Sequence, residues 1–299
     1  MNVLSLFDGM SCGRIALERA GIKVDKYFAC EIDKHAVQIS HKNYPDIVQL
    51  GDVTKVSLKK FKGQISLRYD DDTNDFWSLP TGIDLVIGGS PCQSFSIAGD
   101  GSGFDGSSKL FFEYVRILKE VKTINPDVKF LLENVKMKKE WRDIITKELE
   151  VEPIEFNSRL VSAQNRPRLY WTNIEGIELP EDKGLVLGNV LDVEVEDKFI
   201  LSEKAIAYMD REREPGKSRW DFHKNELDKK SSCLTANMFK GVPYGVIREF
   251  KRRLTPTECE RLQTVPEGYT EGVSNTQRFK MLGNGWTIDV IAHIFKYLL

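Results

Sequence analysis

Short apolar runs alternate with amphipathic segments along the first half of the chain. The apolar runs are typical of strands buried on both faces of a parallel sheet, and they cover residues 3–7, 24–30, 47–50, 83–87 and 128–132. The amphipathic segments predict helices over residues 14–20, 34–43, 109–118 and 138–149. Strands that alternate with helices indicate an α/β fold with a doubly wound, mostly parallel sheet.

Two stretches interrupt this alternation. Residues 59–82 form a polar excursion between the third and fourth units, and we assign it no function. Residues 176–252 are rich in charge, glycine and short apolar pieces, and we interpret them as a small second domain. The larger domain then comprises residues 1–175 and 253–299.

Two helix boundaries are marked near the end of the chain. Thr255 is expected to cap a helix, with Pro256 at the first helical position and Glu258 three residues after the cap. The sequence 283–285, Gly-Asn-Gly, predicts a turn that precedes an apolar helix.

Composition narrows the class of protein. Hydrophobic content of 41% with 29% charged residues is ordinary for a globular protein. No apolar run reaches membrane-spanning length and the first residues carry no basic leader, so we expect no signal peptide and no membrane partner. The five cysteines include no CxxC pair and the four histidines are scattered, so we expect neither a disulfide framework nor a metal site. A reducing cytoplasm fits this cysteine usage.

Charge is unevenly distributed. The net charge of −2 argues weakly against nucleic acid, but residues 215–253 contain ten Lys or Arg and four Asp or Glu. A basic section on an acidic body suits a polyanion held on one side, although a solvated charged face gives the same count. Lys229 and Lys230 form a basic pair that we expect at such a surface.

The candidate chemistry centres on Cys92. Gly88 and Gly89 end the strand before it, and Pro91 fixes the backbone of the turn. A cysteine in that place lies at the carboxyl end of a parallel strand, where open α/β sheets bind their ligands. The segment 93–108 that follows is rich in glycine and serine and is suited to open and close over a site. Alone, Cys92 is either a buried thiol or a nucleophile.

Polar groups also follow the first three predicted strands. Residues 8–13 form a glycine-bearing turn that can bring backbone N–H groups close to a ligand, but the pattern is not GxGxxG, which argues against a dinucleotide oxidoreductase. Glu31 follows the second strand, where a carboxylate commonly holds a ribose, and Asp52 follows the third. Three strand ends that each offer one fitting group predict a nucleotide-like ligand.

Three more charged residues are candidates. Glu133 follows a fully apolar strand, so partial desolvation is expected to let it hold a proton near neutral pH; a helix cap is the alternative. Arg166 and Arg168 flank a proline and share one face if they lie on one strand. Two arginines on one face would bind an anion or a base edge.

These residues stand in motifs that resemble, in the same order, those of the cytosine-5 DNA methyltransferases. Ser90-Pro91-Cys92-Gln93 resembles the nucleophile motif of that family. Other segments resemble its Phe-x-Gly-x-x-x-Gly cofactor loop, its Gln-x-Arg-x-Arg motif and its later motifs, and they lie at 7–13, 164–168, 231–236, 253–263 and 277–291. The motifs at 6–9 and 87–92 are most similar to the animal de novo type, whereas the size resembles a bacterial or phage enzyme.

The resemblance implies a Rossmann-like fold that uses S-adenosylmethionine, with residues 176–252 as a target-recognition domain. The implied reaction transfers the methyl group to ring carbon 5 of cytosine in a specific duplex DNA sequence and leaves S-adenosylhomocysteine. Cys92 would form a covalent adduct with a flipped-out base, and Glu133 would bond ring nitrogen 3 and the exocyclic amine. Arg168 would hold the carbonyl oxygen and Arg166 would favour the thiolate.

The resemblance also implies a cofactor site and a setting. The cofactor residues would be Phe7, Asp8, Gly9, Gly13, Glu31, Ile32, Asp52, Val53, Pro91, Leu110, Asn284 and Trp286. An Asp at position 52 would accept from the adenine amino group. We expect a monomer on double-stranded DNA, with self-association left open, in the cytoplasm of a bacterial or phage-infected cell and in a restriction–modification context.

Two alternatives remain at this point. Related enzymes with this motif set methylate cytosine in transfer RNA, but the chain lacks the Cys-Phe-Thr tripeptide that we associate with that branch. A catalytically silent homologue that binds DNA is the other alternative, and the presence of Cys92, Glu133, Arg166 and Arg168 argues against it.

Overall fold

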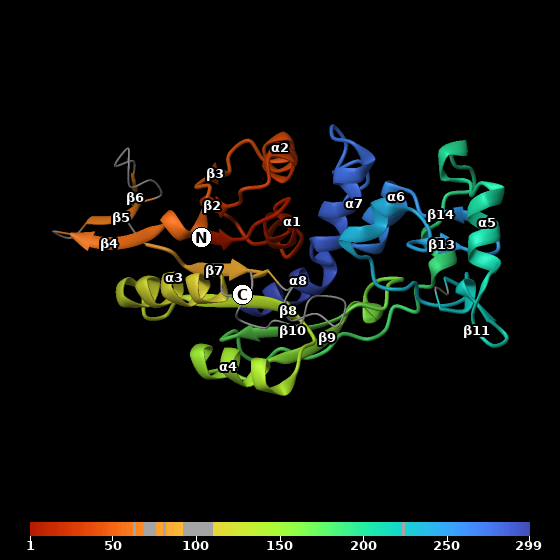
Figure 1. Cartoon of the computed structure of the whole chain (residues 1–299). Helices are drawn as coiled ribbons and strands as arrows, with labels where there is room; N and C mark the ends of the chain where they lie inside the picture. Colours follow the sequence, from red (N-terminus) through yellow and green to blue (C-terminus); the bar gives the residue numbers. More distant parts are fainter. Residues whose placement is uncertain (62–63, 69–75, 80–81, 92–109, 223–224) are drawn as a thin grey trace. The chain divides into compact units, whose positions relative to one another are not determined.

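The structure is a computed structural model that describes residues 1–61, 64–68, 76–79, 82–91, 110–222 and 225–299 (Figure 1). Cys92 and the segment 93–108 therefore lie outside the described residues. The chain divides into two compact units. Unit 1 comprises Met1–Phe156, Pro167–Glu178 and Ala292–Leu299, and unit 2 comprises Asn157–Arg166 and Leu179–Ile291.

A seven-stranded sheet forms the centre of unit 1, in the order β3-β2-β1-β7-β8-β10-β9. Its strands are β1 (Asn2–Leu6), β2 (Lys26–Cys30), β3 (Val48–Gln49), β7 (Leu85–Gly88), β8 (Lys129–Val135), β9 (Ile154–Asn157) and β10 (Pro167–Thr172). The pairs β3–β2, β2–β1, β1–β7 and β7–β8 are parallel, whereas β10 is antiparallel to β8. The predicted doubly wound, mostly parallel sheet is confirmed.

Helices cover both faces of this sheet. They are α1 (Cys12–Arg19), α2 (Lys34–Asn43), α3 (Phe111–Ile124) and α4 (Lys139–Leu149), and the same unit contains the short 3-10 turns η1 (Val53–Lys55) and η9 (Lys296–Leu298). Helix α8 (Ile288–Phe295) begins in unit 2 and ends in unit 1, and the 3-10 turn η4 (Ser158–Leu160) belongs to unit 2. Leu4, Leu6 and Val86 pack in one hydrophobic cluster with apolar residues of α3 and α4. Figure 1 shows α1 and α2 on the other side of the sheet. Alternation of side chains along each strand therefore fills two cores.

The polar excursion at 59–82 contains regular structure that the sequence analysis missed. Strands β4 (Ser57–Phe61), β5 (Gln64–Arg68) and β6 (Phe76–Leu79) form a three-stranded antiparallel sheet. Leu58 and Leu67 are buried in the same cluster as α3, and the Leu58 N–H donates to Glu120 at 2.8 Å. Hydrogen bonding between neighbouring strands is not visible in local periodicity, which explains the omission.

Unit 2 consists of short elements. They are η5 (Leu187–Val190), η6 (Asp197–Phe199), α5 (Glu203–Asp210), β11 (Glu212–Glu214), β12 (Lys217–Ser218), η7 (Arg219–Phe222), η8 (Ala236–Lys240), β13 (Val246–Ile247), β14 (Arg252–Arg253), α6 (Pro256–Leu262) and α7 (Asn275–Asn284). A small core contains Leu201, Met209, Trp220 and Val246.

The turn predicted at 283–285 is wrong in its first part. Gly283 and Asn284 are the last two residues of α7, and Gly285 is the residue that caps its end. A Cβ atom on Gly283 would lie 2.2 Å from the carbonyl carbon of Thr235, so only glycine lets α7 approach the start of η8 so closely. Close packing, rather than a reversal of the chain, accounts for this glycine.

The two units do not coincide with the predicted domains. Residues 253–291, which the sequence analysis assigned to the larger domain, belong to unit 2 together with 157–166. Helix α7 packs on η8 and α6 contacts η5, which explains why the later motifs group with the 179–252 region. The functional boundaries at 175 and 253 stay a prediction.

The predicted cap of α6 is present and gives a stability test. The Thr255 side chain accepts from the Glu258 N–H at 3.1 Å, and the Glu258 carboxylate accepts from the Thr255 N–H at 2.8 Å. Thr255→Ala should lower the free energy of unfolding by about 1 kcal/mol, measured by urea denaturation. Ser274→Ala is the matched control, because Ser274 stands at the N-cap of α7 without a side-chain cap bond. Equal losses in both variants would contradict this account of the cap.

Candidate functional site

The carboxyl ends of four parallel strands meet along one edge of the unit 1 sheet. Leu6 is in register with Cys30 on one side and with Gly88 on the other, and Gly88 is in register with Leu132. The residues that follow these positions therefore start from neighbouring points. They include the loop from Phe7, Glu31, the turn before Cys92, and Glu133.

The loop after β1 is held in an uncommon backbone conformation. Phe7 and Ser11 have φ angles of 59° and 63°, in the left-handed region that non-glycine residues rarely adopt, and Gly9 has a φ of 60°. The Gly9 N–H donates to Glu31 Oε2 at 2.8 Å, and Glu31 Oε1 accepts from the N–H groups of Ile32 and Asp33. Residues in this region cost free energy and cluster at ligand sites, so the loop is built for more than chain reversal.

The side chain of Asp8, a residue of this loop, is buried rather than exposed. Its carboxylate accepts from the Tyr27 hydroxyl at 2.7 Å and from the Ser11 hydroxyl at 2.5 Å. Burial raises the pKa of Asp8 from 3.8 to about 6, against the lowering effect of its hydroxyl donors, and the nearby Glu31 adds to the rise. Sequence analysis placed Asp8 in the cofactor loop but gave no signal for Tyr27.

The other proposed cofactor residues of unit 1 surround the same edge. Gly13 is the second residue of α1, where a Cβ atom would lie 2.3 Å from Ile87 Cδ1, so glycine lets α1 pack against β7. Ile32 is 78% exposed although it is apolar. Asp52 caps η1 through Oδ1, which accepts from the Thr54 N–H at 2.9 Å. Val53, Pro91 and Leu110 are buried or half-buried.

Glu133 and Arg168 form an ion pair. Arg168 Nε lies 2.9 Å from Glu133 Oε1, and the two side chains are 13% and 11% exposed. Glu133 does not follow its strand as predicted: it lies within β8, opposite Tyr170 of β10. The sequence analysis expected apolar surroundings for this carboxylate, whereas the structure places a guanidinium beside it because the antiparallel strand β10 supplies one.

The turn that precedes Cys92 is tied to the strand that carries Glu133. The Asn134 side-chain amide donates to Ser90 Oγ at 3.2 Å and to the Ser90 carbonyl oxygen at 3.3 Å. Both Ser90 and Asn134 are buried. These bonds tie Ser90 to the residue next to Glu133, and the sequence analysis missed Asn134 although it directly follows a candidate residue.

Arg166 is not on the strand that carries Arg168. Strand β10 begins at Pro167, and Arg166 belongs to unit 2, so the expectation that both arginines share one strand face is wrong. Its buried guanidinium donates to the carbonyl oxygens of Leu234, Gly283 and Gly285 at 2.8–3.0 Å, and Nη1 lies 3.4 Å from Cys233 Sγ. Arg166 thereby ties together three of the segments that resemble family motifs.

Asn284 and Trp286 also belong to unit 2. Asn284 is exposed at the end of α7 and Trp286 is buried. Their assignment to the cofactor site stays a prediction. The Arg166 bonds to Gly283 and Gly285 hold the backbone on both sides of Asn284.

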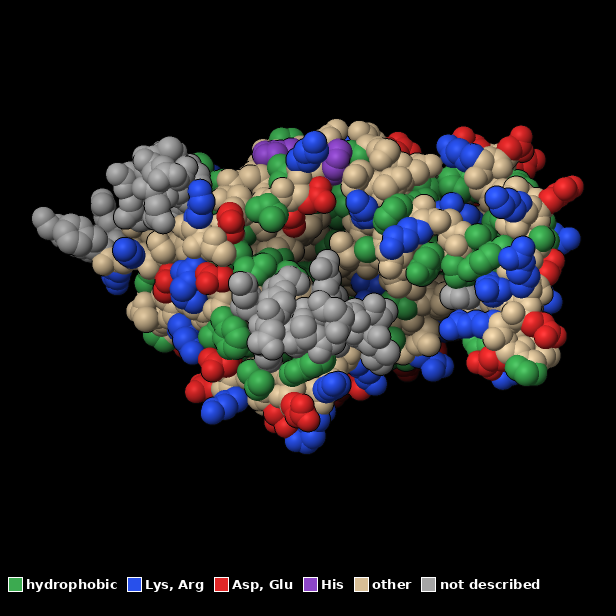
Figure 2. Space-filling view, viewed as in Figure 1, with side chains coloured by type: hydrophobic (Ala, Val, Ile, Leu, Met, Phe, Trp, Pro, Cys, Tyr) green, Lys and Arg blue, Asp and Glu red, His purple; other side chains and the backbone are tan. Residues whose placement is uncertain are grey.

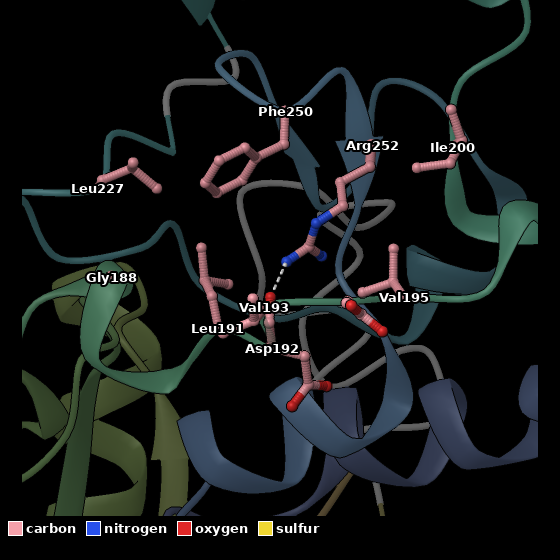
Figure 3. Close-up of a pocket in the computed structure, with 10 residues that line it drawn as sticks. Gly188, Leu191, Asp192, Val193, Val195, Ile200, Leu227, Phe250 and Arg252 are labelled. Carbon is pink, nitrogen blue, oxygen red and sulfur yellow. Dashed lines mark hydrogen bonds between the residues drawn. The ribbon is translucent and has the colours of Figure 1, made fainter.

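A cavity of about 690 Å³ lies in unit 2, apart from all of the predicted site residues (Figure 3). Its walls are mainly apolar and include Leu191, Val193 and Phe250. At its base Arg252 pairs with the buried Glu258 at 2.7 Å, and Asp192 pairs with Arg261 at 2.6 Å. Arg252 and Asp192 are therefore each paired with an opposite charge, and Glu194 is a further charged residue in the lining.

Charged side chains of both signs are interspersed over the visible face (Figure 2). Lys229 and Lys230, the pair expected at a polyanion surface, differ in their surroundings. Lys229 is 64% exposed and pairs with Glu226, whereas Lys230 is 16% exposed. The Lys230 ammonium donates to the carbonyl oxygens of Arg159 and Ser162 and to Asp182. Lys230 is therefore an internal tie of unit 2.

The described residues form neither a membrane-spanning helix nor a cluster of metal ligands. No helix in the described part of the chain is long and apolar enough to cross a membrane. Within the same residues no group of three or more His, Cys, Asp or Glu side chains is placed to hold a metal ion.

Lys230 and Lys229 give a matched test of this distinction. Lys230→Met should lower the free energy of unfolding by about 1–3 kcal/mol, because three acceptors lose their donor. Lys229→Met should leave the urea midpoint unchanged, since Lys229 is mostly exposed and an exposed ion pair contributes little. If Lys230→Met instead leaves stability intact, the lysine is not an internal tie.

Comparisons with known proteins agree with one another. A family model for C-5 cytosine-specific DNA methylases matches residues 1–175 and 192–299. The chain is 31% identical over 327 residues to the Type II methyltransferase M1.ScrFI of Lactococcus lactis subsp. cremoris, covering 99% of this chain and 77% of that protein. It is 27% identical over 330 residues to the Type II methyltransferase M.DsaV of Dactylococcopsis salina, covering 100% and 86%.

The fold is also found among solved structures. The Dnmt2 methyltransferase of S. pombe matches with a TM-score of 0.68 at 18% identity, covering 100% of this chain and 98% of that one. At this identity the match shows a shared fold.

Proposed function

The chain belongs to the C-5 cytosine-specific DNA methylase family, and we propose that it methylates ring carbon 5 of cytosine within a specific duplex DNA sequence. The observation that carries the proposal is the family match over almost the whole chain. The Type II methyltransferases among its relatives support a restriction–modification setting in the cytoplasm. We propose a monomer acting on DNA.

The residues of unit 1 fit S-adenosylmethionine, which supplies a methyl group activated by its sulfonium. Glu31 Oε2 accepts one N–H in the structure and has a second lone pair for a ribose hydroxyl. Asp52 uses Oδ1 for its own backbone and can accept an amino group at Oδ2. The exposed Ile32 offers apolar surface to a base ring.

Cys92 is the proposed nucleophile. Ring carbon 5 of cytosine is a poor nucleophile, and addition of a thiolate to ring carbon 6 makes it enamine-like. After carbon 5 gains the methyl group it loses its proton, the bond between Cys92 sulfur and carbon 6 breaks, and the ring double bond returns. Cytosine in a duplex is out of reach of such attack, so the base must leave the stack.

Glu133 and Arg168 are the proposed partners of the ring. Addition at carbon 6 places charge on the ring, and a proton shared between Glu133 and ring nitrogen 3 would offset it. Arg168 Nε pairs with Glu133 Oε1, so the two groups lie together, and we propose that the carboxylate bonds the exocyclic amine and the guanidinium bonds the carbonyl oxygen. The Ser90–Asn134 bonds support the placing of Cys92 beside this pair. Arg166 is proposed to act on the thiolate through the segments it holds.

A trapped adduct tests the nucleophile. In duplex DNA whose target cytosine carries fluorine at carbon 5, the elimination step has no proton to remove, so protein and DNA should stay covalently joined through Cys92. We expect a denaturation-resistant complex with the wild type and S-adenosylmethionine, and none with Cys92→Ser. Cys233→Ser is the control, because Cys233 is a half-buried cysteine that forms no disulfide in the described part of the chain. A complex formed equally by Cys92→Ser would exclude this role.

Turnover tests the acid. Glu133→Gln keeps the shape but cannot exchange a proton, so the methylation rate should fall by a factor on the order of 10² or more. The control is Glu155→Gln, since Glu155 is an exposed carboxylate on β9 paired with Lys136. Tritium transfer from labelled S-adenosylmethionine to DNA measures both. Similar rates for the two variants would remove Glu133 from the chemistry.

A further inference from the structure

Asp8 is buried among hydroxyl groups, with no cation bonded to it in the described part of the chain. Tyr27 of β2 donates to Oδ1 at 2.7 Å, and Ser11 donates to Oδ2 at 2.5 Å. Ser5 of β1 is a further hydrogen-bond partner. Every one of these groups can direct a hydrogen at the carboxylate, which is the arrangement that suits its ionised form.

The hydrogen bonds continue beyond the loop. Ser11 Oγ lies 2.6 Å from Ser40 Oγ of α2, and Gln49 of β3 donates to Ser40 Oγ at 3.2 Å. The chain of polar groups thus connects the loop after β1 to β2, α2 and β3. Ser11 is also one of the two non-glycine loop residues in the left-handed region, so the bond to Asp8 helps to hold a strained backbone.

An ionised carboxylate in this place costs stability. Burial raises the pKa of Asp8 from 3.8 to about 6, so the folded protein binds a proton between these values that the unfolded chain releases. The contribution of Asp8 to the free energy of unfolding is therefore fully present below pH 3.8 and is lost as the pH rises through about 6. At neutral pH the free energy of unfolding stays lower by that amount. A buried group that lowers the stability of the protein, as the ionised Asp8 does, is commonly found at a functional site.

We propose that the ionised form of Asp8 is a positioning residue for S-adenosylmethionine: it fixes residues 7–13 in the conformation that binds the cofactor. The inference rests on the proposed function. Asp8 acts through the loop rather than by contact, since its oxygens face Tyr27 and Ser11. Affinity for the cofactor then depends on pH in a range where most carboxylates do not titrate.

Protonation has a defined effect on the hydrogen bonds. A neutral Asp8 carries a hydrogen on one oxygen, which then faces a hydroxyl that was its donor. Protonated Asp8 then donates to the Ser11 hydroxyl, Ser11 donates to the Ser40 hydroxyl, and the Ser40 hydrogen needs an acceptor near Gln49. Gln49 Oε1 is buried and has no hydrogen-bond partner among the described residues, so rotation of that amide would provide one.

Other titratable groups near Asp8 are accounted for. Tyr27, Cys12, Cys30 and Glu31 interact with Asp8 or with its partner Tyr27, and burial raises the pKa of Tyr27 and of Cys30, so neither titrates near neutral pH. The packed helix α2 also carries His35 and His41. A His35→Gln/His41→Gln variant controls for both.

Calorimetric titration with S-adenosylmethionine from pH 5 to 8 tests the proposal without DNA. For the wild type the affinity should fall about tenfold between pH 7.5 and 5, as the competent fraction falls. Asp8→Asn should bind weakly with no pH dependence across this range, and its Tm at pH 8 should exceed that of the wild type. The double histidine variant should follow the wild type.

Tyr27→Phe gives an independent readout. Loss of one donor to the carboxylate should move the midpoint of the pH profile upward, whereas a purely structural role for Tyr27 would leave the midpoint in place. Wild-type affinity with an unchanged pH profile in Asp8→Asn would overturn the inference. Absence of cofactor binding by the wild type at pH 8 would instead contradict the proposed function.

Discussion

The register of four parallel strands is the constraint on which the rest of the site depends. Leu6, Cys30 and Gly88 are paired at the ends of β1, β2 and β7, and Gly88 is level with Leu132 of β8, so the residues that follow these four positions start from adjacent points. Residues far apart in the sequence, such as Glu31 and Glu133, thereby come to one edge. A shift of one residue in any pair would turn the side chains of a strand to the opposite face and separate these groups.

Much of this arrangement could be predicted from the sequence because its causes are local. Apolar runs predicted the five strands of the parallel part to within three residues, and Thr255 with Glu258 predicted the cap of α6, which is present. The motif order indicated the family that the comparisons show. The candidate cofactor residues of unit 1 could be placed at strand ends, since parallel strands end at one edge.

The missed features depend on distant parts of the chain. Arg166 was expected on one strand with Arg168 because the two flank a proline, but its buried guanidinium is satisfied by Leu234, Gly283 and Gly285. Lys230 was taken for a surface charge because it lies in a basic stretch, but its ammonium bonds to distant residues of unit 2. Neither Tyr27 beside Asp8 nor Arg168 beside Glu133 follows from local pattern, because each contact is made by a neighbouring strand.

The central claim is that the chain methylates cytosine in duplex DNA through Cys92. Incubation with S-adenosylmethionine and random duplex DNA, followed by conversion sequencing, tests it most directly. We predict carbon 5 methylation within one short repeated sequence, absent for Cys92→Ser. Methylation of transfer RNA but not of DNA in a parallel reaction, or equal activity of the wild type and Cys92→Ser, would contradict the account.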